Sequence, residues 1–120
     1  PVFQGKRQDK DHAADVSRTY EANDRLTLLM REHQAQQYQL IAQYNAAKAI
    51  YDRQQSEVLP LLRKKVSLVN AQYRGGSSAL PELLAARRDL LNGEIASNNA
   101  EKALADAWAA VRYLIPQDVK

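Results

Sequence analysis

Tyr73-Arg74-Gly75-Gly76-Ser77-Ser78 decides the fold of this chain, because it separates two long stretches of helical pattern. Glycine takes positive φ at little steric cost, so this pair can close the end of a helix. Ser77 or Ser78 can then cap the next helix, and Pro81 is tolerated in its first turn. A short break between two long helices predicts an antiparallel α-helical hairpin with its tip at residues 74–78.

Before the tip, the sequence predicts one long helix over residues 10–73. This stretch contains no glycine, only Pro60 as a proline, and mostly favourable helix formers. At 1.5 Å per residue, roughly 60 residues give a helix roughly 90 Å long. Pro60 predicts a bend near residues 55–59 that does not end the helix. A heptad-like stripe with some polar members runs along it: Leu26, Met30, His33, Gln37, Leu40, Tyr44, Ala47, Tyr51, Gln54 and Val58.

After the tip, a second helix is predicted over residues 79–114, followed by an exit segment at 115–120 in which Pro116 ends the helix. A lead-in segment at 1–9 is predicted before the first helix. Its large apolar residues thin out to Ala96, Ala100 and Ala103, which lets a neighbouring helix approach closely. The second helix is too short to cover the first, so residues 11–37 keep an apolar stripe without a partner in this chain. We therefore expect an all-α fold whose first helix is the longer and whose bundle other segments or subunits complete.

Composition excludes several classes of function. The 120 residues carry a formal net charge of +3 spread along the chain, which does not indicate nucleic-acid binding. There is no cysteine for thiolate or disulfide chemistry, and no apolar run long enough to span a bilayer. The chain opens at Pro1 without an initiator methionine, which suggests a piece of a longer protein.

No residue pattern indicates an active site. His12 and His33 lack the further ligands that a zinc site needs, and the carboxylates are distributed along thin helices without a pocket. The Gly-Gly-Ser-Ser segment lacks the lysine of a phosphate-binding loop. We expect no catalytic residue, no cofactor and no metal, and hence no enzyme.

A basic cluster lies about two turns before the tip. Arg63, Lys64 and Lys65 form it, with Arg74, Arg87 and Arg88 nearby. Two interpretations stay open: a solvated face, or a surface that docks a partner bearing acidic groups.

The segment Tyr73 to Arg87 resembles the hairpin-tip motif of TolC-type outer-membrane efflux proteins. That motif reads roughly Tyr-Arg-x-Gly, a short variable stretch that includes an apolar position, then Glu/Asp-Leu/Val-Leu-x-Ala-Gln/Arg. The matching residues are Tyr73, Arg74, Gly76, Leu80, Glu82, Leu83, Leu84, Ala86 and Arg87. The opening residues 1–8 are similar to the family's exit from a barrel strand, and residues 107–114 resemble the end of the returning helix. The resemblance leans toward the cation and heavy-metal efflux branch.

The resemblance implies a periplasmic hairpin, the second of two in each protomer, in the wall of a homotrimeric duct whose parent sits in the outer membrane of a Gram-negative cell. Its tip would meet a periplasmic adaptor (membrane fusion) protein for export of metal cations or small toxic compounds. The docking residues would be Tyr73, Arg74, Gly75, Gly76, Ser77, Ser78, Leu80 and Glu82. As an isolated piece, the chain is expected to dimerise through its unpaired stripe. The alternative is a generic structural coiled coil without a transport role.

Overall fold

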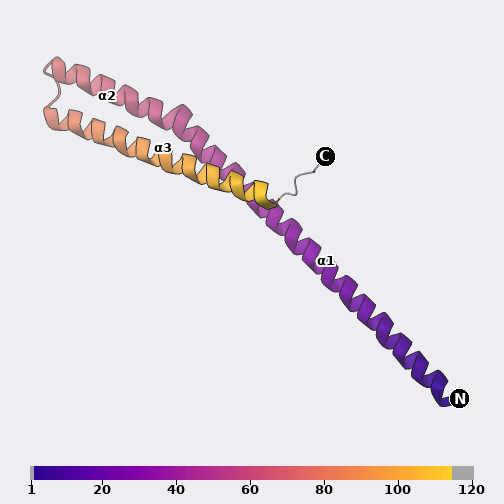
Figure 1. Cartoon of the computed structure of the whole chain (residues 1–120). Helices are drawn as coiled ribbons and strands as arrows, with labels where there is room; N and C mark the ends of the chain where they lie inside the picture. The colour runs from indigo at the N-terminus through magenta and orange to yellow at the C-terminus, as the bar shows by residue number, and fades with distance from the viewer. Residues whose placement is uncertain (1, 115–120) are drawn as a thin grey trace, which may run out of the picture. The chain divides into compact units, whose positions relative to one another are not determined.

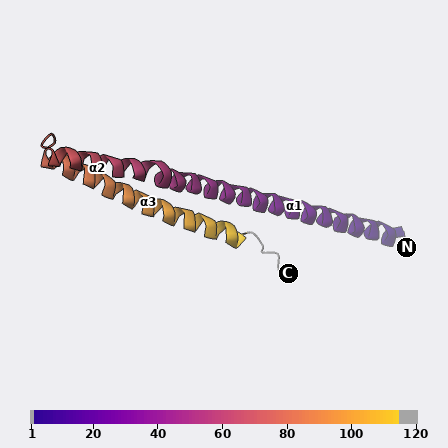
Figure 2. The same ribbon diagram turned by 90° about the horizontal axis from the view of Figure 1, so that it is seen from above.

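The computed structural model describes residues 2–114, with side chains from residue 7 onward, and this part of the chain is helical apart from the tip. Its elements are α1 (Val2–Arg53), a π-helical turn η1 (Gln54–Val58), α2 (Leu59–Arg74) and α3 (Leu80–Leu114). The fold is all-α, and α2 and α3 run antiparallel side by side (Figures 1 and 2). The predicted helical hairpin is confirmed, with the first helix the longer. The exit segment predicted at 115–120 lies outside the described residues.

Residues 1–38 form one unit, and its described residues, 2–38, belong to α1. The helix begins at Val2, whereas the sequence predicted a lead-in up to Asp9; glutamine, lysine and arginine are favourable helix formers, and one glycine costs only about 1 kcal/mol. Every described side chain from residue 7 to residue 36 is exposed. These include Leu26 and Met30 of the predicted stripe, at 54% and 64% exposure.

Residues 39–120 form the second unit, which contains the hairpin. Along the last part of α1 and the π turn, the half-buried positions repeat the predicted stripe: Leu40, Tyr44, Ala47, Tyr51, Gln54 and Val58. On α3 the covered positions also recur at steps of three and four: Leu83, Ala86, Leu90, Gly93, Ser97, Ala100, Leu104, Ala107 and Val111. We call these two facing rows the seam. A period of 3.5 residues is the pattern of a two-helix coiled coil.

Small residues set the spacing at the middle of the seam. Gly93, Ser97 and Ala100 are buried there, whereas Ala96 and Ala103, also expected at the contact, are exposed. A Cβ atom on Gly93 would press into the Leu62 Cδ1 methyl group and lie 3.5 Å from Leu59 Cδ2. The side chain of Gln55 reaches across from the first helix, and its Nε2 donates to Ser97 Oγ at 2.6 Å. The helices therefore approach closely because this face of α3 has almost no side-chain volume.

The π-helical turn shifts the seam by one residue. An uninterrupted α-helix would continue the stripe from Val58 to Leu61 and Leu68, but these leucines are 68% and 59% exposed. The seam instead continues at the buried Leu59, five residues after Gln54 and next to the half-buried Val58, and Leu59 N–H donates to the Gln54 carbonyl. Five-residue bonding is the definition of a π turn. The interruption expected near residues 55–59 thus takes this form, and helix resumes at once.

Pro60 accounts for the position of the turn. It has no N–H to give to the carbonyl four residues earlier, and its ring crowds that carbonyl in a regular α-helix. Widening the preceding turn relieves the crowding. Ser56 adds a local bond, its hydroxyl donating to the Asp52 carbonyl at 2.7 Å.

Candidate functional site at the hairpin tip

The tip closes α2 with a Schellman motif. Gly76 has φ +82°, the positive value that glycine favours, while Gly75 stays in the right-handed region at φ −83°. Ser77 N–H donates to the Gln72 carbonyl at 2.9 Å, and Gly76 N–H donates to the Tyr73 carbonyl at 3.1 Å. This six-to-one and five-to-two pair of bonds defines the motif. The sequence analysis expected the glycine pair to close the helix end through positive φ, and of the two only Gly76 adopts it.

The two serines act differently from the sequence prediction, in which one of them caps the second helix. Ser77 Oγ donates to the Gln72 carbonyl at 3.2 Å, so it belongs to the end of α2. Ser78 Oγ donates to the Glu82 carboxylate, one turn into α3. Ala79, whose carbonyl accepts the amides of Glu82 and Leu83, directly precedes α3 and has no side chain with which to cap. The prediction of a serine cap was therefore wrong, because α3 starts one residue later, at Leu80.

Pro81 occupies the first turn of α3, as predicted. Its missing N–H costs little there, since the first amides of a helix have no intrahelical acceptor. Glu82 lies in the same turn, where the helix dipole favours a negative charge. Arg74 likewise lies in the last turn of α2, where the dipole favours a positive charge. The tip is thus locally stable and rigidly bonded.

The predicted docking residues form one connected, largely exposed group. Tyr73 and Leu80 are 41% and 47% exposed, and Ser78 alone is half-buried. Sequence reasoning missed Gln72, whose carbonyl accepts bonds from both serines. The signal was available, since a Schellman motif places that acceptor four residues before its positive-φ glycine.

The basic cluster is exposed and only partly neutralised. Lys65 Nζ lies 3.5 Å from Asp89 Oδ2, which ties α2 to α3. Both partners keep about half of their side-chain surface in solvent, so the pair adds less than about 1 kcal/mol. Arg63, Lys64 and Arg87 are exposed on the same two helices. The surface therefore presents positive charge toward solvent beside the tip.

The described side chains form no cluster with the features of a catalytic or metal site. Within residues 2–114, no three metal-ligating side chains cluster, and His33 Nε2 instead pairs with the Gln37 side chain at 3.3 Å. The helices in that same range also lack a segment that is both apolar and long enough for a membrane span.

Comparison with protein-family models, curated proteins and solved structures finds no match for this chain.

Proposed function

We propose that this chain is a periplasmic hairpin in the wall of a TolC-type outer-membrane efflux duct, and that its tip docks a periplasmic adaptor protein. The parent would be a homotrimer in a Gram-negative outer membrane that exports metal cations or small toxic compounds. The chain supplies wall and docking surface and performs no chemistry.

One observation carries this proposal: α3 bears a second apolar row away from the seam. Leu80, Leu84, Leu91 and Ile95 are each about half exposed, at 47%, 56%, 56% and 51%. Their spacing of four, seven and four residues puts them on one side of the helix. A free two-helix hairpin needs only the seam. The outer row supports packing of this hairpin against further helices, as in the wall of a helical barrel.

The tip supports the docking role through its rigidity and charge. The Schellman bonds fix the backbone of residues 72–77, and the flanking helices present arginine and lysine to solvent. A partner surface carrying acidic and small polar groups would complement this end of the hairpin.

The outer row can be tested in the full-length parent protein. Leu91→Glu places a charge in the row, and the neighbouring Asn92→Glu adds the same charge at an exposed position outside it. We expect Leu91→Glu to reduce trimer assembly and export, measured by native electrophoresis of the outer-membrane fraction and by resistance to exported metal or drug. Asn92→Glu is expected to leave both near wild type. Equal behaviour of the two variants would refute the wall assignment.

The docking role is tested separately with Gly76→Val, because valine cannot readily adopt the positive φ found there. We expect normal trimers with weakened adaptor crosslinking and reduced export. If export is unchanged, the tip does not dock the adaptor. A parent without flanking strand patterns and without an earlier copy of the hairpin would favour the alternative, a structural coiled coil without a transport role.

A further inference from the structure

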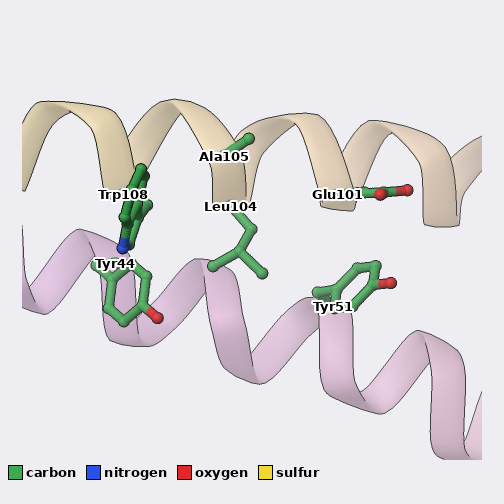
Figure 3. A pocket seen from close by; sticks show the side chains of 6 residues that line it. All are labelled: Tyr44, Tyr51, Glu101, Leu104, Ala105 and Trp108. Carbon is green, nitrogen blue, oxygen red and sulfur yellow. The ribbon is translucent and has the colours of Figure 1, made fainter.

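A cavity of about 320 Å³ lies between α1 and α3 in the hairpin unit, well away from the tip. Its lining consists of Tyr44, Tyr51, Glu101, Leu104, Ala105 and Trp108 (Figure 3). Leu104 points from α3 into the space between the two tyrosine rings, and Trp108 lies against the Tyr44 end. The volume is at the lower end of the range for small-molecule sites.

The two ends of the cavity differ in chemistry. Tyr44, Leu104 and Trp108 make one end apolar and aromatic. At the other end, the carboxylate of Glu101 extends on the same side as the Tyr51 ring (Figure 3). Glu101 makes no ion pair among the described residues, whereas the nearby Lys48 and Asp52 neutralise each other at 3.6 Å. An aromatic face beside an unneutralised carboxylate is favourable for an organic cation.

Arg112 does not take the place of such a cation. Its guanidinium lies 4.9 Å from the centroid of the Trp108 ring. Arg112 follows Glu101 by eleven residues, about 16 Å along the helix axis. It therefore holds the indole at the apolar end and leaves the Tyr51 and Glu101 end for a separate positive charge.

We infer that this cavity binds amphiphilic organic cations, with the apolar body against Tyr44, Leu104 and Trp108 and the ammonium group at Tyr51 and Glu101. Nonspecific electrostatic attraction between the chain and a cation does not explain such binding, because the whole chain has a formal net charge of +3. Anionic analogues would meet the Glu101 carboxylate and be repelled. The inference is independent of the efflux proposal.

The chain carries its own reporter, because Trp108 is its single tryptophan. Hexyltrimethylammonium is titrated into the 120-residue chain while Trp108 fluorescence is followed, with calorimetry as a second readout. Hexanol and hexanoate serve as the neutral and anionic counterparts. We expect saturable binding of the cation in about the millimolar range, since a ligand this small has few atoms to contribute. Hexanol should bind about tenfold more weakly, and hexanoate more weakly still.

Variants assign the binding to the cavity. Glu101→Gln should weaken cation affinity about three- to tenfold and leave hexanol affinity unchanged. Glu94→Gln makes the same change two turns earlier on α3, outside the cavity, and should have no effect. Tyr51→Leu keeps the apolar bulk but removes the ring, so it should also weaken the cation selectively. Far-UV circular dichroism checks that each variant stays helical.

Three results would each overturn the inference. The first is a titration without saturation. The second is equal affinity for hexyltrimethylammonium and hexanol, which would mean an apolar crevice without charge recognition. The third is equal loss in Glu101→Gln and Glu94→Gln, which would mean that only overall charge matters. If Glu101→Gln loses helicity, Tyr51→Leu decides between cation recognition and apolar binding.

Discussion

Gly93→Ala tests whether close helix contact stabilises the hairpin. Gly93 is buried in the seam of α3, and a Cβ atom there would overlap the Leu62 Cδ1 methyl group, so the Leu62 side chain would have to shift. Two effects of opposite sign compete. Alanine is the better helix former, but the added methyl group must displace Leu62.

The magnitudes favour a net loss. Alanine gains about 1 kcal/mol over glycine inside a helix. An extra carbon forced into a packed contact costs about 1–3 kcal/mol. Because Leu62 is half-buried and can move only in part, we take a cost near the middle of that range. The free energy of unfolding should therefore fall by about 1 kcal/mol.

A double-mutant cycle isolates the steric effect. In a Leu62→Ala background the opposing methyl group is absent, so Gly93→Ala should stabilise the chain by about 1 kcal/mol. The sign reverses, and the coupling between the two sites is about 2 kcal/mol. Urea unfolding of the four proteins is followed by circular dichroism at 222 nm. Measurements at several protein concentrations separate folding from self-association.

Asn99→Ala is the matched control, since it improves helix propensity at an exposed position of the same helix. It should stabilise by about 0.5 kcal/mol in either background. The reasoning fails if Gly93→Ala stabilises the wild-type chain as much as it stabilises Leu62→Ala. In that case the Leu62 side chain can move aside without a measurable loss of stability.

Three further predictions use the same unfolding assay. Gly76→Ala should destabilise by about 1 kcal/mol because of its positive φ, whereas Gly75→Ala should be near neutral; equal effects would contradict the Schellman geometry. Gln55→Met should lower the free energy of unfolding by about 1 kcal/mol, because it leaves the buried Ser97 hydroxyl without its partner. Ser97→Ala should cost less, and a larger loss from Ser97→Ala than from Gln55→Met would contradict this reasoning. Lys65→Met should cost less than about 1 kcal/mol at low salt and nothing at high salt; a salt-independent loss would indicate packing instead of ion pairing.

The sequence predicted the coarse fold well, because its signals are local. Helix propensity, the stripe from Leu40 to Val58 and the double-glycine break each depend on a few neighbouring residues. The candidate tip was also found from the sequence, since a helix that ends at adjacent glycines has few alternatives.

Details that depend on hydrogen-bond register were not predictable in the same way. Leu61 and Leu62 are equally apolar, and only the width of the turn before Pro60 decides which one faces α3. Similarly, a serine before a helix is a good cap in general, but Ser78 lies one residue too early for that geometry. The expectation that the thin helices form no pocket was wrong, because the cavity between α1 and α3 is lined by residues from two distant parts of the sequence.

The π-helical turn at Gln54–Val58 also has a consequence for how the length of this chain can change. The turn holds one residue more than an α-helix needs while keeping Leu59 on the inner face. Deleting Ser56 together with Pro60→Ala should thus yield an unbroken α-helix with the same inner residues. A codon gained or lost elsewhere in the hairpin would instead rotate everything beyond it by about 100°. Insertions and deletions in related genes are therefore expected to accumulate just upstream of Pro60.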